Sequence, residues 1–222
     1  MSLLHSKLSA LDYLCIDDFP DFERFPTEGL VAPNLTCLDL CYCPMLKSLP
    51  SHMNTLLPKL RSLRIKNCPK IDAFPEGGLP TNLETLVIVE CRNLLRSLSL
   101  IGVHNGLTLF LIDDASIESD KSFPWEGFLP QLPSLHTLQL IKFKNIETLD
   151  YSDLLHLTSL QVLRIQDCPK LKNMVGERLP PSLTKLKIDD SMLLGEQCKK
   201  KHPQIWHKIC DISAIQVDWR YV

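Results

Sequence analysis

Cysteine and histidine are the residues of this sequence whose types and spacing could support chemistry. Near the C-terminus, Cys198, His202, His207 and Cys210 have a spacing loosely like that of a zinc site. Pro203 would break a helix that aligned the first two, and covering the end of a hydrophobic core explains this stretch without zinc. We therefore expect neither a metal site nor a cofactor, with zinc as the alternative interpretation of these four residues.

Three further cysteines could form a thiol cluster. Cys37 and Cys41 are expected on one exposed strand face beside Cys15 of the preceding strand, where a redox site is the alternative to simple surface thiols. The chain has nine cysteines, an odd number that cannot all pair internally. Residues 1–14 lack the basic and long apolar regions of a secretory signal, so we expect a reduced, cytoplasmic chain.

Motifs typical of enzymes are absent from the sequence. There is no G-x-S-x-G or H-E-x-x-H, and the seven histidines are scattered, so we expect no catalytic residues. A formal net charge of -2 and a pI near 6.4 give no electrostatic reason to expect nucleic acid or anionic lipid. No apolar stretch is long enough to cross a membrane, so we expect no membrane partner.

The elements that position these residues come from an internal repeat. Residues 59–71 read KLRSLRIKNCPKI and residues 159–171 read SLQVLRIQDCPKL, which share the pattern L-x-x-L-x-L-x-x-C-P-x-L. The leading leucine recurs every 23 to 28 residues, close to the period of leucine-rich repeats. Its positions are Leu11, Leu35, Leu60, Leu83, Leu107, Leu135, Leu160 and Leu183.

Each unit is expected to hold one short strand with two inward apolar residues. The first inner column is Leu14, Leu38, Leu63, Leu86, Phe110, Leu138, Leu163 and Leu186. The second is Ile16, Leu40, Ile65, Ile88, Ile112, Leu140, Ile165 and Ile188. Side chains alternate between the two faces of a strand, and one short strand cannot bury its apolar face alone. Parallel stacking of the strands would close a continuous core.

The predicted fold is an α/β leucine-rich-repeat solenoid with a curved parallel β-sheet on its concave face and a mostly irregular convex side. Residues 1–192 would form about eight repeats, and residues 193–222 a C-terminal cap with a short helix at Glu196–His202 that ends at Pro203, then a strand near Ala214–Trp219. The start of the chain shows no comparable cap. We therefore expect the C-terminal part of a longer protein, or the product of a truncated gene.

Further core positions follow each strand. The position where the chain turns inward holds Phe19, Cys43, Cys68, Cys91, Ala115, Phe143, Cys168 and Ser191. Its four cysteines are therefore expected to pack in the core rather than to form disulfides. Residues 116–131 form an insertion, whose Trp125 is expected to pack onto the convex side, and Tyr151–Leu157 has the spacing of one or two helical turns.

The repeats resemble those of a known family. Residues 60–88, LRSLRIKNCPKIDAFPEGGLPTNLETLVI, and the tail EQCKKKHPQIWHKICDISAIQVD at 196–218 are similar to plant intracellular nucleotide-binding, leucine-rich-repeat disease resistance proteins of the coiled-coil type. The resemblance implies recognition of pathogen effectors or guarded host proteins, and autoinhibition of a nucleotide switch. The sequence has no G-x-x-x-x-G-K-S/T loop and no coiled-coil heptads, so nucleotide binding does not carry over.

Outward strand positions are the candidate protein-binding site. They combine charged residues with an apolar group, and next to them Asp113 and Asp189 add to a mixed-charge concave face. The candidate residues are Asp39, Arg64, Lys66, Val87, Val89, Leu109, Leu111, Gln139, Arg164 and Lys187.

The predicted function is non-catalytic protein recognition in plant innate immunity. The partner would be a pathogen effector, a host protein or the nucleotide-binding domain of a parent receptor. Two alternatives are a secreted leucine-rich-repeat inhibitor of a pathogen enzyme and a substrate receptor of a ubiquitin ligase. The first would require a signal peptide and paired cap cysteines, and the second an adaptor-binding helical domain.

Overall fold

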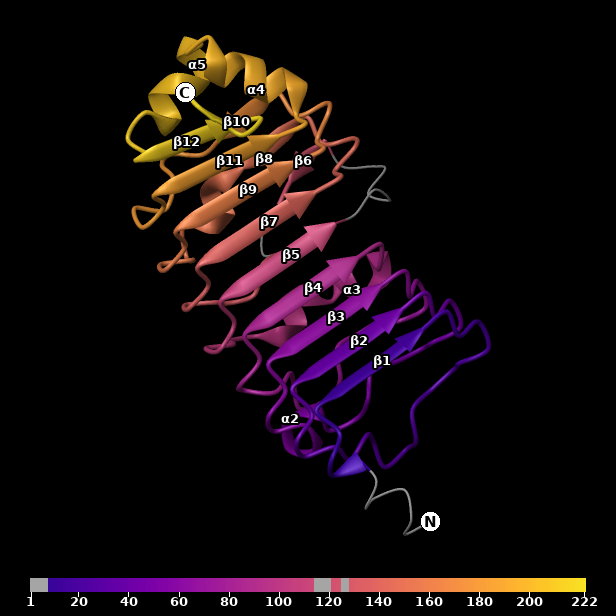
Figure 1. Cartoon of the computed structure of the whole chain (residues 1–222). Coiled ribbons are helices and arrows are strands. Elements are labelled where there is room, and N and C mark those ends of the chain that lie inside the picture. Colours follow the sequence, from indigo (N-terminus) through magenta and orange to yellow (C-terminus); the bar gives the residue numbers. More distant parts are fainter. Residues whose placement is uncertain (1–7, 114–120, 125–127) are drawn as a thin grey trace. The chain divides into compact units, whose positions relative to one another are not determined.

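A computed structural model describes residues 8–113, 121–124 and 128–222. Most of its regular structure is parallel β-sheet, with a few short helices (Figure 1). The chain divides into two compact units between Leu107 and Thr108. The predicted boundary between residues 192 and 193 lies inside the second unit and stays a prediction. Among the described residues, no helix combines the length and the apolar character that crossing a membrane requires.

Four parallel strands pair in chain order in the first unit. They are β1 Tyr13–Asp17, β2 Cys37–Cys41, β3 Ser62–Lys66 and β4 Thr85–Val89. Their register aligns the two predicted columns without a slip, so that Leu38 lies beside Leu63 and Leu40 beside Ile65. The inner side chains of β2, β3 and β4 are buried, whereas Leu14 and Ile16 of the end strand β1 are only half-buried.

The second unit repeats this arrangement. Its parallel strands are β5 Leu109–Asp113, β7 Thr137–Ile141, β9 Val162–Gln166, β11 Lys185–Asp189 and β12 Ala214–Val217, with β13 Arg220–Tyr221 antiparallel to β12. Leu138, Leu163 and Leu186 align in one column, and Ile165 and Ile188 lie in the other. The strand predicted near Ala214–Trp219 is thus confirmed over Ala214–Val217.

Eight strands of the larger sheet end in the same backbone conformation. Directly after a strand stands a residue with φ between 46° and 58°, in the left-handed region. These residues are Asp18, Tyr42, Asn67, Glu90, Lys142, Asp167, Asp190 and Asp218. Asp and Asn tolerate this region better than most residues, which explains their frequency here. The amide of Tyr42 then donates to the carbonyl of Lys66 on the neighbouring strand at 2.9 Å, and the chain turns into the core.

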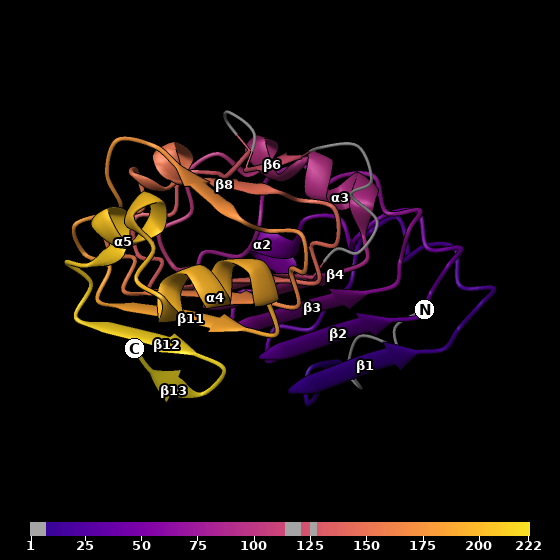
Figure 2. The same cartoon turned by 90° about the horizontal axis from the view of Figure 1, so that it is seen from above.

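A second, small sheet covers the other side of the core in the second unit. It consists of β6 Ser122–Phe123, β8 Thr148–Asp150 and β10 Asn173–Val175, all parallel, and Figure 2 shows β8 and β6 across the core from β11 and β12. Phe123, Leu149 and Met174 align across it and are buried. The predicted irregular convex side is therefore partly regular here. The 3-10 helix η2, Tyr151–Leu154, confirms the expected helical turn.

Short helices occupy the corresponding side of the first unit. They are α2 Met53–Leu56, α3 Arg92–Arg96 and the 3-10 helix η1 Leu98–Ile101. The last two follow β4. Their Leu94, Leu95 and Leu98 are buried and fill the core there.

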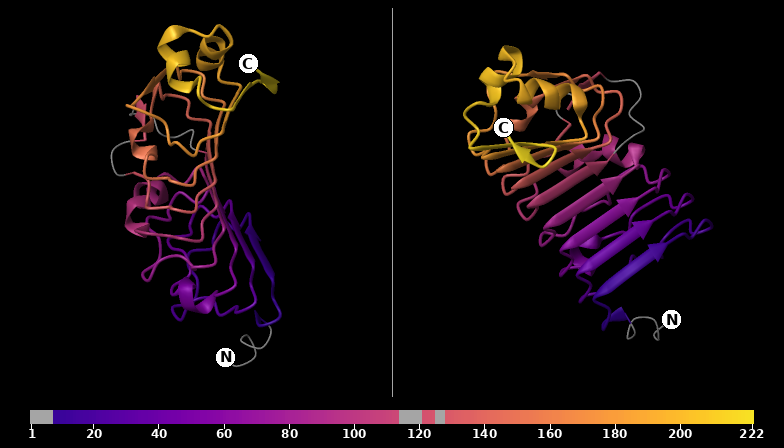
Figure 3. Two further views of the ribbon diagram at one scale, coloured as in Figure 1. Left: turned by 90° about the vertical axis from the view of Figure 1, so that its left-hand side faces the viewer. Right: turned by 45° about the horizontal axis from the view of Figure 1, so that its top comes forward.

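Two helices close the C-terminal end of the second unit, as Figure 3 shows in two views. They are α4 Met192–Lys199 and α5 Pro203–Ile209. The predicted helix at Glu196–His202 was wrong in extent, because the helix begins earlier and ends at Lys199. Pro203 begins the second helix, where its missing N–H is not needed. Gly195 lets α4 approach the sheet, since a Cβ there would lie 3.0 Å from Val217 Cγ1.

Two other expectations about core residues have separate outcomes. Phe19 was predicted to be in the core, but 58% of its surface is exposed. It follows β1, the end strand of the sheet, and no described strand lies beyond β1 to cover it. Trp125 and residues 116–120 lie outside the described residues.

The cysteines that follow the strands are packing residues, as predicted. Cys43, Cys68, Cys91 and Cys168 are buried and all are free thiols. Desolvation raises the pKa of Cys168 to about 11. A hydrogen bond with Cys91 lowers the pKa of Cys68 to about 7, yet its side chain has no solvent-accessible surface.

Alkylation of the native chain with iodoacetamide at about pH 8 is expected to modify Cys15 and Cys210 first, because both are exposed. Burial raises the pKa of Cys198 to about 12, so this thiol should react slower by about tenfold or more. Mass spectrometry of timed digests would measure both rates. Labelling of Cys198 as fast as of Cys210 in the folded chain would contradict the burial described.

Candidate functional site

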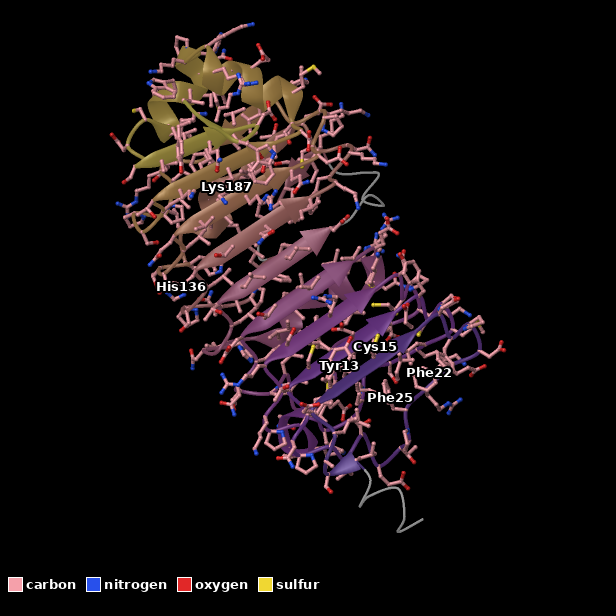
Figure 4. All side chains as sticks on the ribbon, in the orientation of Figure 1. Tyr13, Cys15, Phe22, Phe25, His136 and Lys187 are labelled. Atoms are coloured by element: carbon pink, nitrogen blue, oxygen red, sulfur yellow. The ribbon has the colours of Figure 1, made fainter. Side chains whose placement is uncertain are left out.

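The outward side chains of the first unit form three rows across its strands. The strand register places Tyr13, Cys37, Ser62 and Thr85 in one row, then Cys15, Asp39, Arg64 and Val87, then Asp17, Cys41, Lys66 and Val89. Figure 4 shows Tyr13 and Cys15 on this face. The rows hold two carboxylates, Asp17 and Asp39, and two cations, Arg64 and Lys66, so they carry no net excess of either charge.

Asp39 is the centre of a hydrogen-bonded group in the first unit. Arg64 Nη1 lies 3.0 Å from Asp39 Oδ2, and the Tyr13 hydroxyl donates to the same oxygen at 3.2 Å. The Cys37 thiol donates to Asp39 Oδ1 at 3.6 Å. A hydrogen bond with Cys15 and the negative charge of Asp39 raise the pKa of Tyr13 to about 12. Tyr13 therefore stays protonated at neutral pH and remains a donor.

This group corrects the expectation for Asp39. The residue lies on the outward side of β2, as predicted, but only 5% of its surface is exposed, because its neighbours cover it. Asp113 and Asp189 were also expected to be exposed and are buried. Lys142 Nζ lies 2.9 Å from Asp113 Oδ2, so this carboxylate too has a cation beside it.

The remaining predicted residues of the first unit are accessible in part. Arg64 is exposed, and Lys66, Val87 and Val89 are half-buried. Lys66 Nζ lies 4.8 Å from the centre of the Tyr42 ring, and a hydrogen bond with Tyr42 raises the pKa of Lys66.

The outward face of the second unit has a different charge distribution. Its first row is Leu109, Thr137, Val162, Lys185 and Ala214; its middle row is Leu111, Gln139, Arg164, Lys187 and Gln216. These two rows hold three cations and no carboxylate. The predicted residues Leu109, Leu111, Gln139, Arg164 and Lys187 are all half-buried here.

Arg164 makes two contacts that sequence reasoning did not find. Its Nη2 lies 3.1 Å from Asp189 Oδ2, and its Cζ lies 5.5 Å from the centre of the Trp219 ring. Both carboxylate oxygens of Asp189 and the Nε of Arg164 lack an aligned hydrogen bond among the described residues. The pair is therefore held by charge. Trp219 was overlooked as a partner of Arg164 because it lies in the turn between β12 and β13, where the repeat pattern has ended.

The two cysteine sets do not form compact sites. Cys198 is buried on α4, whereas His202, His207 and Cys210 are exposed. Among the described residues, no three His, Cys, Asp or Glu side chains gather to hold a metal ion. Cys15 is exposed, while Cys37 and Cys41 are half-buried at opposite ends of β2.

In each of the two units, every repeat adds one strand to a parallel sheet. Polar and charged residues are accessible on the outward side of that sheet. These features define a class of repeat protein. No family model matches the chain. The chain is 34% identical over 196 residues, 87% of its length, to an Arabidopsis thaliana protein named "Putative disease resistance protein". It spans only 13% of the length of that relative. The similarity supports a relationship with plant disease resistance proteins.

Proposed function

We propose that this chain is a leucine-rich-repeat module that recognises protein in plant defence. It would correspond to the C-terminal portion of an intracellular, coiled-coil-type nucleotide-binding resistance protein and act in the cytoplasm without catalysis. Its partner would be a pathogen effector or a guarded host protein. In a full receptor it would also make autoinhibitory contacts with the nucleotide-binding domain.

The observation that carries this proposal is the register of the repeat. Every described unit places the same two apolar columns inward and a variable residue outward between them. The same backbone hydrogen bonds recur one unit apart: Thr36 O accepts from the amides of Arg61 and Ser62, and Arg61 O from those of Glu84 and Thr85. The backbone is therefore the same from repeat to repeat, whereas the residue types in the outward rows can differ and so provide specificity for a partner.

The similarity to a plant disease resistance protein supports the biological setting. A broad, accessible face that carries both charged and apolar side chains suits the binding of a protein partner. Cytoplasmic location agrees with nine free thiols, because disulfides are rare in a reducing compartment.

Photo-cross-linking would test the proposal in leaf cells. Benzoylphenylalanine would replace Val87 or Gln139, which lie outward in the middle rows of the two units. The control positions are Lys59 and Lys170, which are exposed residues outside the strands. Distinct protein adducts are expected only from the two strand positions. Equal adducts at control positions, or none at the strand positions in healthy and infected tissue, would refute recognition through this face.

A further inference from the structure

The outward face of the second unit carries two lysines that no other described residue neutralises. Lys185 and Lys187 lie two residues apart on β11 and point to the same side. No ion pair or hydrogen bond of either ammonium group occurs among the described residues. Arg164 lies directly beside Lys187 on the neighbouring strand. Figure 4 shows Lys187 on this face.

Two cations directly opposite each other on paired strands repel and destabilise a sheet. Adjacent strands are about 4.8 Å apart, so Arg164 and Lys187 are close neighbours. Asp189 offsets part of this charge through its contact with Arg164, but the three cations and this one carboxylate still leave a net positive charge. The repulsion among these three cations lowers the stability of the folded chain. An anion that binds across them would offset this repulsion, which explains why the cations lie together.

Four described carboxylates near this face lie at one side of it. Asp167, Asp189, Asp190 and Asp218 lie at or directly after the ends of their strands. Asp218 is engaged by Lys199, whose Nζ lies 2.8 Å from Asp218 Oδ2. The first and middle rows therefore remain cationic, and the acidic side chains lie beyond them.

Trp219 adds a second, independent observation. Its φ is 66°, a conformation that is strained for a bulky residue, and 69% of its surface is exposed. Burial of the ring therefore contributes little to stability, yet the β12–β13 turn holds the ring against Arg164. The two-residue turn between β12 and β13 requires a positive φ at both Asp218 and Trp219. The ring, held by this turn, orients the guanidinium of Arg164 beside Lys187.

We propose that Arg164, Lys185 and Lys187, with Trp219 as a positioning residue, bind a short acidic segment of a protein partner. This inference rests on the proposed recognition function and names the chemistry of its partner. The middle row from Gln139 to Gln216 crosses four strands, or roughly 14 Å, the length of four or five extended residues. The side-chain amides of Gln139 and Gln216, at the two ends of this row, can hydrogen-bond the backbone of the partner segment. The carboxylates of that segment would face the three cations.

Fluorescence anisotropy with a fluorescein-labelled octaglutamate peptide tests this directly, with octaglutamine as the neutral probe. The full chain should bind octaglutamate, more weakly at 200 than at 50 mM NaCl because salt screens exposed charges, and should not bind octaglutamine. Lys185→Gln/Lys187→Gln should weaken binding at least fivefold, and Trp219→Ala about twofold to threefold. The matched control Lys59→Gln/Lys70→Gln removes the same charge from exposed sites of the first unit and should change affinity less than twofold.

Each other outcome has a defined meaning. Equal weakening by the control pair, or no octaglutamate binding, would overturn the acidic-segment assignment. Tighter binding of a single-stranded oligonucleotide or of phosphatidylserine vesicles through the same lysines would replace a protein segment with nucleic acid or lipid. If octaglutamate fails to bind while cross-links still form at position 139, recognition stands and only the acidic chemistry is wrong. Circular dichroism of each variant confirms that it is folded.

Discussion

Replacing Leu63 by alanine is expected to lower the free energy of unfolding by about 2–5 kcal/mol. Leu63 has no exposed surface, and it lies between Leu38 and Leu86 in the first inner column. The substitution would leave a cavity between two neighbouring units, in addition to removing apolar surface from the core. Urea denaturation followed by circular dichroism would measure the loss.

Leu100→Ala is the matched control for this substitution. It removes the same atoms from a leucine of η1 that is 77% exposed, so a change within about 0.5 kcal/mol is expected. If both variants lost the same stability, the inner columns would not be the source of the core, and the repeat register would be in doubt.

Replacing Arg164 by methionine is expected to cost about 3 kcal/mol of unfolding free energy, because Asp189 would become a buried carboxylate without a cation. Asp189 is 3% exposed, and its oxygens have no aligned hydrogen bond among the described residues that could compensate. Arg164→Met/Asp189→Leu removes both charges and should regain most of the loss. Thermal and urea unfolding of the two single variants and the double variant would give the coupling energy.

Arg64→Met is the comparison in the first unit. Its partner Asp39 keeps the hydroxyl of Tyr13 and the thiol of Cys37, and the Arg64 side chain is 49% exposed. A cost of about 1 kcal/mol or less is therefore expected. Equal losses at the two arginines would show that the remaining hydrogen bonds of the carboxylate do not decide the effect. No recovery in the double variant would show that Asp189 is not the residue left unpaired.

Much of the fold follows from the sequence because strand alternation has a period of two. Leu63 and Ile65 had to face the same side, and the recurrence of this pair every 23 to 28 residues placed equivalent residues side by side. The helices α3 and η1 were not predicted, since Leu94, Leu95 and Leu98 depart from the repeat pattern. Pro203 was assigned the end of a helix, although it begins one, because proline suits the first turn of a helix as well as a break.

The candidate site was predicted as a set of positions but not as a set of environments. Alternation placed Asp39 and Arg64 on the outward side of their strands. Whether a side chain there is accessible depends on neighbours from other units: Tyr13, Cys37 and Arg64 cover Asp39, and the turn after β12 brings Trp219 to Arg164. The residue types in the outward rows follow no repeating pattern, so the sequence does not predict these contacts.

The sequence by itself determined which residues face the core and in which order the strands pair within each unit. The reason is that the same pair of apolar residues recurs in every repeat along the chain. The tertiary structure decided which outward charges are neutralised. Asp39, Asp113 and Asp189 are buried beside cations from neighbouring segments, while Lys185 and Lys187 have no ion pair within the part of the chain that the structure describes. Ion pairing requires that two charged groups lie within a few ångströms of each other. Side chains that are distant in sequence come this close only when neighbouring repeats pack together.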